Sequence, residues 1–477
     1  MINISGIIKS IQNIMRQDKG LNGDAQRIEQ LGWMIFLKIF DDKDIEMELL
    51  QEDYVSPIPS ELQWHNWASD DEGITGDELL NFIDNRLFTE LKTLPSASTN
   101  KRALLVQEVF EGNNNYMKSG TLLRQVINKL NEIDFNSSED KHLFGDIYET
   151  ILKELQSAGN SGEFYTPRAI TQFVTDMVAP KLGEIVFDPA CGTGGFLTSA
   201  IEHIRANEVK SIEDRVILQH SIRGVELKPL PHMLGLTNLI LHDIEVPDIV
   251  YDDALSRELT SITQKDRVDC ILANPPFGGN VSDGMETNFP ANYRTKESAD
   301  LFLILMIQYL KNGGRAGIVL PDGSLTGDGV KARIREKLLT DCNLHTIVRL
   351  PDTVFKPYAQ VATNLLFFTK GTPTKEIWYY EHKLPEGQKA YSKTKPIKIS
   401  EFETLKQWWE NKEENERAWK VDIGTIIDNG YNLNLKNPHK EEEKEIHTSI
   451  ELIDMLHNSF NKSDELLNQL KNELSNG

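Results

Sequence analysis

Short apolar or β-branched runs alternate with helical stretches from Gly183 onwards, and no other feature limits the possible folds of this chain as strongly. We expect strands at residues 184–188, 221–226, 268–273, 315–320, 344–350 and 364–369. Strands separated by helices are typical of an α/β domain, in which helices cover both faces of a mostly parallel sheet. The last two runs are separated by only a short loop, so we expect an antiparallel pair at the sheet edge.

The segments on either side of this domain have different patterns. Residues 1–158 are predicted to form a helical domain, with apolar residues at helical spacing from Ile4 to Met15 and further helices at 25–40 and 139–155. We place the α/β domain at 159–371. Residues 372–477 form a polar C-terminal region with a terminal docking helix, whose apolar seam consists of Ile453, Leu456, Phe460, Leu467, Leu470 and Leu474. Such a seam is typical of a coiled coil or of a helix that docks on a partner, although a helix that folds back on its own bundle has the same spacing.

Composition excludes several classes of protein. A chain of 477 residues has room for two to four domains of ordinary size. Its apolar runs are far shorter than the roughly 18 residues that cross a bilayer, and the N-terminus has no secretory pattern, so we expect a cytoplasmic protein without membrane contact. Three cysteines have neither disulfide-framework nor metal-ligand spacing, and we expect no metal. With 51 basic and 73 acidic residues the net charge is −22, which argues against gripping nucleic acid through the overall field.

A glycine-rich turn joins the first expected strand to a helix. The segment Asp188-Pro-Ala-Cys-Gly192-Thr193-Gly194-Gly195-Phe196-Leu197 lacks the lysine of a phosphate-binding P-loop, and it has Leu197 where a dinucleotide fingerprint requires glycine. The acidic Asp188 ahead of the glycines disfavours a pyrophosphate but can pair with an ammonium group or a bound water.

Two further carboxylates complete a possible ligand site. Glu226 ends the next strand and is suited to both hydroxyls of a ribose, and Asp243 follows the next helix and can accept from an exocyclic amine. A ligand with an amino acid end, a ribose and an adenine, but no phosphate, fits these groups. S-adenosylmethionine is such a ligand.

A second motif follows the expected strand at 268–273. The turn Asn274-Pro275-Pro276-Phe277 is stiff, because two prolines fix φ and remove two backbone donors. Its carbonyls and the Asn274 amide can accept both hydrogens of a planar amino group, and Phe277 offers a flat face for an aromatic ring. An ordinary proline turn at a strand end would explain Pro-Pro alone, but not Asn-Pro-Pro-Phe after a strand and downstream of the glycine-rich turn. The residues alone do not separate adenine N6 from cytosine N4 or a glutamine side chain.

Together these segments resemble amino-group DNA methyltransferases, and in particular the modification (M) subunit of type I restriction–modification systems. The similarity lies in Gly162-Glu-Phe-Tyr-Thr-Pro-Arg168, in the glycine-rich turn and in Asn274-Pro-Pro-Phe277, and it extends over nearly the whole chain. It implies a Rossmann-like S-adenosylmethionine-dependent methyltransferase domain between a helical bundle and a helical tail. The resemblance assigns the cofactor to Glu163, Phe164, Tyr165, Thr166, Pro167, Arg168, Asp188, Gly192, Thr193, Gly194, Gly195, Phe196, Glu226 and Asp243, and the catalytic role to Asn274, Pro275, Pro276 and Phe277.

The resemblance also implies the reaction and the partners. The reaction is methyl transfer to N6 of an adenine flipped out of duplex DNA, which marks host DNA. Sequence reading belongs to a separate specificity (S) subunit, bound by two M subunits, and the complex also includes the restriction (R) subunit. The alternatives are a methyltransferase for another planar amine and a non-catalytic assembly protein with a vestigial fold, although the latter predicts damaged motifs.

Overall fold

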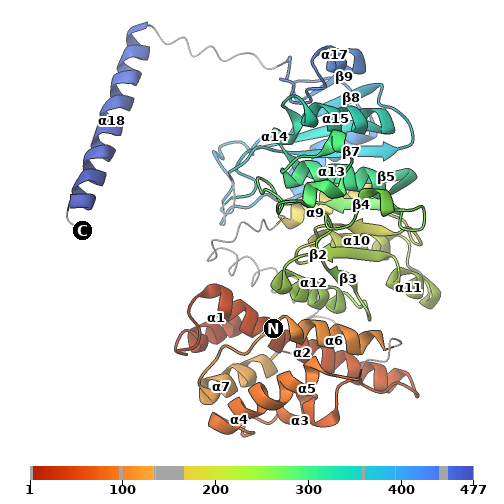
Figure 1. Ribbon diagram of the computed structural model, residues 1–477, viewed down its shortest axis with the longest axis vertical. Coiled ribbons are helices and arrows are strands. Elements are labelled where there is room, and N and C mark those ends of the chain that lie inside the picture. The colour runs from red at the N-terminus through yellow and green to blue at the C-terminus, as the bar shows by residue number, and fades with distance from the viewer. Residues whose placement is uncertain are drawn as a thin grey trace. The chain divides into compact units, whose positions relative to one another are not determined.

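The structure is a computed structural model that describes residues 4–95, 100–133, 135, 166–356, 360–392, 394–439 and 449–475 (Figure 1). It divides into two compact units, Met1–Lys436 and Asn437–Gly477. The helix expected at 139–155 lies outside the described residues.

Helices form the N-terminal part of the first unit. They are α1 (Ile4–Met15), α2 (Asp24–Leu50), α3 (Trp64–Trp67), α4 (Gly76–Phe82), α5 (Phe88–Lys92), α6 (Lys101–Glu111) and α7 (Gly120–Asn131). The predictions for α1 and α2 are confirmed, although α2 continues ten residues beyond the expected end at Phe40. The extension is polar, and ion pairs one turn apart support it, Lys38 with Asp42 and Lys43 with Glu46.

Among the described residues, nine strands form one mixed sheet in the order β3-β2-β1-β4-β5-β7-β6-β8-β9. The strands are β1 (Val186–Asp188), β2 (Ile222–Glu226), β3 (Asp248–Tyr251), β4 (Val268–Ala273), β5 (Leu310–Pro321), β6 (Cys342–Leu350), β7 (Thr363–Lys370), β8 (Glu376–Glu381) and β9 (Ala418–Asp422). Strands β3, β2, β1, β4 and β5 are parallel, and β7 is antiparallel to both of its neighbours. All six expected strands are present.

The sheet is larger than the sequence pattern predicts. The expected antiparallel pair, β6 and β7, is not at the edge, because β8 pairs with β6 and β9 pairs with β8. The boundary expected at residue 371 therefore falls inside the sheet, which the polar composition of the following segment conceals. The boundary at 158 lies among residues that the structure does not describe, and it stays a prediction.

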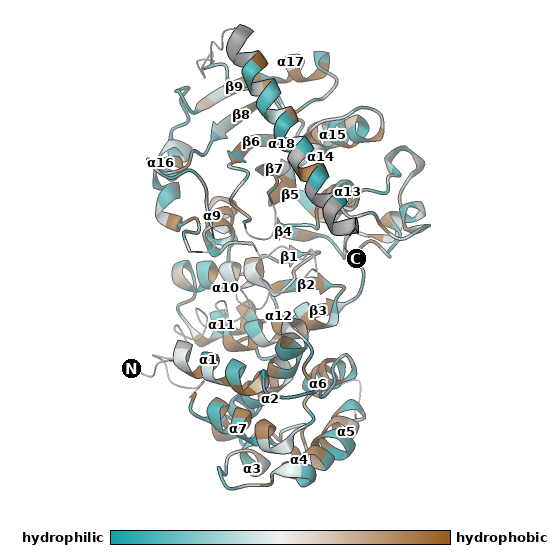
Figure 2. Cartoon of the chain, turned by 90° about the vertical axis from the view of Figure 1, so that its left-hand side faces the viewer, coloured by the Kyte–Doolittle hydropathy of each residue, from teal (hydrophilic) through white to brown (hydrophobic). Residues whose placement is uncertain are grey.

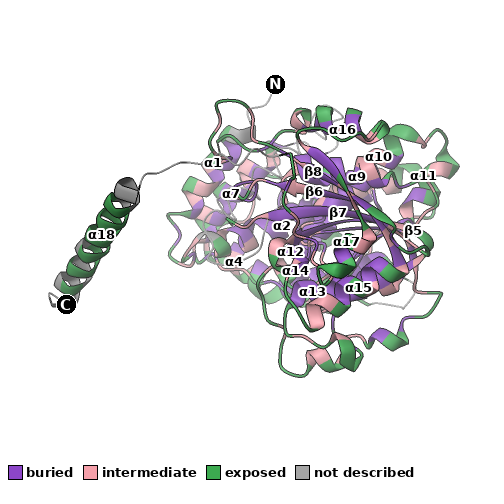
Figure 3. Ribbon diagram, turned by 90° about the horizontal axis from the view of Figure 1, so that it is seen from above, coloured by how far each residue is buried: buried purple, intermediate pink, exposed green. Residues whose placement is uncertain are grey.

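Helices cover both faces of the sheet (Figure 2). One hydrophobic core lies under α9 (Arg168–Val178), α10 (Gly195–Asn207), α12 (Pro229–Leu241) and α16 (Glu403–Glu410), and it is continuous with the core of the N-terminal helices. The other lies under α13 (Ser298–Tyr309) and α15 (Val330–Asp341), near the short α14 (Asp322–Leu325) and α17 (Ile423–Asp428). Helix α11 (Ile212–Gln219) lies towards the outside, and the strands between the two layers are mostly buried (Figure 3).

The N-terminal helices are fixed to the sheet domain through α12 and the turn after it. A Cβ on Gly32 of α2 would lie 2.4 Å from the Met233 methyl group of α12, so the two helices approach closely. The buried Arg102 donates to Asp44 Oδ1 at 2.5 Å and to the Glu245 carbonyl oxygen at 2.6 Å, and its guanidinium lies over the Phe40 ring.

The second unit contains α18 (Ser449–Ser475). Within it, the apolar side chains of Ile453, Leu456, Phe460 and Leu467 are between 57% and 69% exposed, so these four residues of the expected seam are uncovered within their own unit. In the ranges that the structure describes, no helix combines the length and the apolar character that a membrane span requires.

We predict that Arg102→Met destabilises the protein by about 3–5 kcal/mol, because the substitution leaves the buried Asp44 carboxylate without its cation. Arg86→Met is the matched control, since Arg86 pairs with Glu61 and Glu90 at the surface and such pairs contribute at most about 1 kcal/mol. Urea unfolding followed by circular dichroism measures both variants. Equal losses for the two would contradict a stabilising role for the buried bridge.

Candidate cofactor and amino-group site

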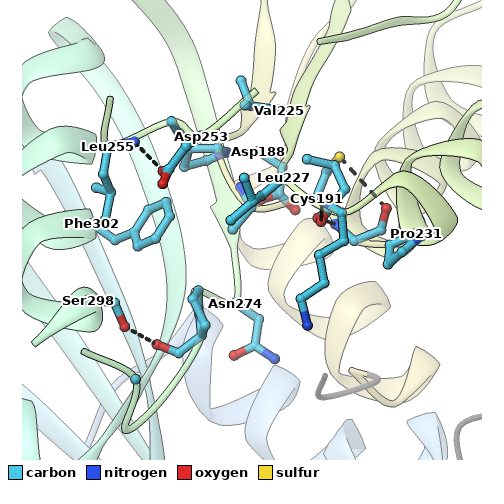
Figure 4. A pocket seen from close by; sticks show the side chains of 18 of the residues that line it. Asp188, Cys191, Val225, Leu227, Pro231, Asp253, Leu255, Asn274, Ser298 and Phe302 are labelled. Carbon is cyan, nitrogen blue, oxygen red and sulfur yellow. Dashed lines mark hydrogen bonds between the residues drawn. The ribbon is translucent and has the colours of Figure 1, made fainter. Parts of the chain in front are cut away.

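A cavity of about 550 Å³ lies at the carboxyl ends of β1, β2, β3 and β4 (Figure 4). Each strand delivers polar groups to it: Asp188 ends β1, Glu226 ends β2, Asp252 and Asp253 follow β3, and Asn274 follows β4. Open α/β sheets bind ligands at this edge. Parallel pairing therefore brings together side chains that are up to 86 positions apart in the sequence.

The glycine-rich turn forms one wall of the cavity. Gly192 and Gly194 have φ values of 54° and 80°, a region that favours glycine, and Gly194 caps the N-terminus of α10. Helix α12 holds the turn from behind, because Asn238 Nδ2 donates to the Thr193 carbonyl oxygen at 3.0 Å. Gly192, Thr193, Gly195 and Phe196 line the cavity, as the sequence predicts.

The Asp188 carboxyl is buried in the floor of the cavity. Burial raises its pKa to about 8, the Ala190 N–H donates to Oδ1 at 3.0 Å and opposes this shift, and the charge of Glu226 adds to it. The carboxyl is therefore largely protonated at neutral pH, and a cation placed beside it would favour the ionised form.

The Glu226 carboxylate is fixed by backbone donors on both oxygens. The Gly192 N–H donates to Oε2 at 2.9 Å and the Lys228 N–H donates to Oε1 at 2.8 Å. A carboxylate oxygen has more than one acceptor direction. A carboxylate held in this way at the cavity wall can accept from two vicinal hydroxyl groups.

Asp243 does not belong to the cavity, so the prediction that it contacts the cofactor there is wrong. It lies directly after α12, where Oδ1 accepts from Lys43 Nζ of α2 at 2.8 Å. Burial alone would lower the pKa of Lys43, but the bonds and charges of Asp243 and Glu46 raise it. The carboxylates that line the cavity after the third strand are Asp252 and Asp253. These two aspartates were not predicted because β3 was not predicted, although two consecutive aspartates after the apolar pair Ile249-Val250 signal a strand end.

The two polar atoms of the Asn274 side chain differ in their hydrogen bonding. Its Nδ2 donates to Thr166 Oγ1 at 2.8 Å. Its Oδ1 is buried and has no hydrogen-bond partner among the residues that the structure describes. A buried acceptor without a partner carries an energetic cost, so a donor that reached this oxygen would remove that cost.

The prolines that follow are anchored from α13. Ser298 Oγ donates to the Pro276 carbonyl oxygen at 3.0 Å, and the Ser298 N–H donates to the Gly279 carbonyl oxygen at 3.1 Å (Figure 4). Pro276 lines the cavity. The ring of Phe277 packs edge-on against Phe355, with 6.2 Å between ring centroids.

The structure does not bring every expected residue to the cavity wall. Of those that it describes, Pro167, Arg168, Gly194, Pro275 and Phe277 lie outside the lining. Arg168 instead forms an ion pair with Glu202 at 2.5 Å. Glu163, Phe164 and Tyr165 are outside the described residues, so their predicted contacts with the cofactor stay predictions.

Comparison with known proteins agrees with this arrangement. Residues 139–447 match the family N-6 DNA Methylase, and residues 4–130 match the HsdM N-terminal domain. The methylase subunit of the type I restriction enzyme EcoEI of Escherichia coli is 54% identical over 482 residues, which cover 99% of this chain and 98% of the relative.

Two solved structures share the fold. A modification subunit of a type I restriction enzyme from Vibrio vulnificus YJ016 has a TM-score of 0.84 and 45% identity, covering 92% of this chain and 98% of that one. A chain from a type I R-M system studied for complex assembly and conformational transition has a TM-score of 0.82 and 35% identity, covering 99% and 98%. The chain belongs to the N-6 DNA methylase family, among the methylase subunits of type I restriction enzymes.

Proposed function

We propose that this chain transfers a methyl group from S-adenosylmethionine to N6 of adenine in duplex DNA, as the modification subunit of a type I restriction–modification complex. The observation that carries the proposal is the buried Asn274 Oδ1, which lacks a donor among the described residues and belongs to a side chain at the wall of the cavity. An amino group on a flipped base is a donor of the required kind.

The residues present fit S-adenosylmethionine. Asp188 would face its ammonium group, Glu226 its ribose hydroxyls, and Asp252 or Asp253 the amino group of its adenine. The cavity volume of about 550 Å³ is within the range of small-molecule sites. When bound, the cofactor would supply a methyl group on a positively charged sulfur.

The protein's own contribution is alignment and polarisation of the amine. Asn274 Oδ1 and the Pro275 carbonyl oxygen would accept the two amine hydrogens, which returns electron density to a nitrogen lone pair otherwise shared with the ring. Thr166 holds the Asn274 side chain through Nδ2, and Ser298 holds the turn through the Pro276 carbonyl oxygen, so little reorganisation is needed during the reaction. The amine proton can leave after the transfer, and no strong general base is required.

The net negative charge of this chain is consistent with a complex in which another subunit provides most of the DNA binding. A chain with a net charge of −22 needs help to hold DNA, and a specificity subunit that carries two copies of this chain would provide grip and sequence reading. The exposed apolar seam of α18 is suited to pack against that subunit, and the restriction subunit would join the assembled complex.

Asn274→Ala should reduce methyl transfer to adenine by at least about 10²-fold, the effect of removing one preorganised polar contact to the reacting group. Cofactor affinity should stay within twofold of the wild type. Transfer of labelled methyl groups to duplex DNA by the complex with the specificity subunit, followed by base analysis, measures the first effect, and calorimetry measures the second. Asn207→Ala, at an exposed position on α10, is the matched control. Labelled cytosine or protein in place of labelled adenine would contradict the proposal.

Cofactor binding should depend on pH through Asp188. With a pKa of about 8, its carboxyl is mostly protonated at pH 6 and must lose that proton to pair with the ligand's ammonium group. Affinity should therefore rise by about tenfold per pH unit between pH 6 and 7, and fall again above about pH 8, where an α-amino group deprotonates.

The matched variant is Asp188→Asn, which cannot release the proton. It should bind the cofactor more weakly than the wild type at pH 8 and show no rise between pH 6 and 7. Titration calorimetry at each pH measures both proteins. A wild-type affinity that stays constant across this interval would exclude the assigned role of the carboxyl.

A further inference from the structure

One segment of this acidic chain is strongly basic. Residues 382–398, which we call the basic loop, contain five lysines and a single acidic residue, Glu386, whereas the whole chain has a net charge of −22. Four of these lysines belong to the described part of the chain, and all four are exposed: Lys383, Lys389, Lys395 and Lys398. None of the four forms an ion pair with another described residue.

The basic loop begins at the same sheet edge as Asn274. It follows β8, which is parallel to β6, while β6 and β5 are both antiparallel to β7 and β5 is parallel to β4. The carboxyl ends of β4, β5, β6 and β8 therefore lie along one edge. Four strand spacings separate β4 from β8, a distance of roughly 20 Å. At 3.4 Å per base pair, this distance corresponds to about six base pairs of duplex.

A series of contacts connects the basic loop to the Asn274-Pro-Pro-Phe277 turn. The Tyr391 N–H of the loop donates to Thr353 Oγ1 at 3.1 Å, in the connection between β6 and β7. Two residues further along this connection, Phe355 is buried and packs edge-on against Phe277, with 6.2 Å between the ring centroids. Along this path, the connection between β6 and β7 is all that separates the loop from the turn.

The basic loop is held in place by its own buried residues. Tyr391 is 1% exposed, and its hydroxyl donates to Glu401 Oε2 at 2.5 Å. Ser392 and Lys395 exchange two backbone hydrogen bonds of 3.1 Å each, and Ile397 is buried. The backbone that carries the lysines therefore has a defined position, which lowers the ordering cost of binding a partner.

We propose that the basic loop is a DNA-backbone contact of this chain, in which Lys383, Lys389 and Lys395 bind phosphates within about six base pairs of the flipped nucleotide. The inference rests on the proposed function for the identity of the nucleic acid. Lysine ammonium groups bind phosphates as point charges and do not read bases. The loop would therefore hold the DNA without duplicating the sequence reading of the specificity subunit.

An acidic surface of another subunit is the competing partner for these lysines. Position favours DNA, since a base that binds at Asn274 must approach the strand-end edge at which the loop begins. The charge of the remaining chain also favours DNA. Without the net +4 of the loop, the net charge of −22 would be −26, so a local cationic surface is needed where this chain approaches a phosphate backbone.

The test replaces Lys383, Lys389 and Lys395 together with glutamine, in complex with the specificity subunit. The matched control replaces three exposed lysines that precede β1, β4 and β8 at the opposite edge, Lys181, Lys265 and Lys375. One probe is a duplex oligonucleotide with a site that the wild-type complex methylates, and the other is a duplex of random sequence. The dissociation constant of each duplex is measured between about 50 and 200 mM salt, and kcat is measured at saturating DNA.

Each lost phosphate contact should lower the slope of log affinity against log salt by about 0.9, so the three substitutions should lower it by about 2.7. Affinity at about 50 mM salt should fall about tenfold or more, to the same extent for both duplexes. The kcat at saturating DNA should stay within about twofold, because none of the three lysines lines the cavity. The control variant should match the wild type in all three quantities.

A second measurement uses the wild-type complex and does not depend on the folding of a variant. Amine-directed labelling followed by mass spectrometry compares the complex with and without the duplex. DNA should protect Lys383, Lys389 and Lys395 from labelling, and it should leave the three control lysines as reactive as before.

Other outcomes overturn the inference. An unchanged salt slope in the loop variant, or equal labelling of its lysines with and without DNA, would exclude the contact. A slope that falls equally in the control variant would reduce the effect to net charge. Protection of the loop by the specificity subunit instead of by DNA would assign it to a protein partner. A wild-type complex that binds the duplexes through these lysines but methylates no adenine would refute the proposed function alone, so the two failures are distinguishable.

Discussion

Parallel pairing of four neighbouring strands is the constraint on which the site depends. Strand β1 pairs with β2 on one side and β4 on the other, so Asp188 lies between Glu226 and Asn274 along a single edge. None of these side chains needs to bind its neighbour to stay there, because the ladder hydrogen bonds fix the spacing. The unsatisfied oxygen of Asn274 and the largely protonated carboxyl of Asp188 are tolerated because the surrounding sheet and helices determine their positions.

Helix α12 connects this edge to the N-terminal helices. On one side, Gly235 allows α12 to approach the glycine-rich turn, since a Cβ there would lie 3.0 Å from the Gly192 carbonyl oxygen. On another side, Met233 fills the space above Gly32 of α2. Beyond its end, Asp243 pairs with Lys43. The helix that supports the glycine-rich wall of the cavity is therefore also the main support of the N-terminal helices, and its packing tolerates little change on either side.

Much of the fold and of the site was predictable from the sequence, and the errors have physical causes. Strand β4 was predicted with its observed bounds, because a fully buried strand reads as a continuous apolar run. Strand β3 has one buried position in four, so it lacks that signal, and its absence from the prediction led to Asp243 in place of Asp252 and Asp253. Strands β8 and β9 were missed because they follow a polar loop, although Trp378-Tyr-Tyr380 has the aromatic content of a strand. The contact between Thr166 and Asn274 depends on tertiary structure and has no signature in the local sequence.

The exposed apolar seam of α18 has a consequence for how much of this chain a cell can make relative to its partner. A helix of 27 residues is about 40 Å long, and along it the described apolar side chains of the seam have no cover from their own unit. Copies made in excess of their partner would present this stripe to one another and to other apolar surfaces. Production of the subunits in matched amounts would then prevent aggregation of this chain and also complete the assembly.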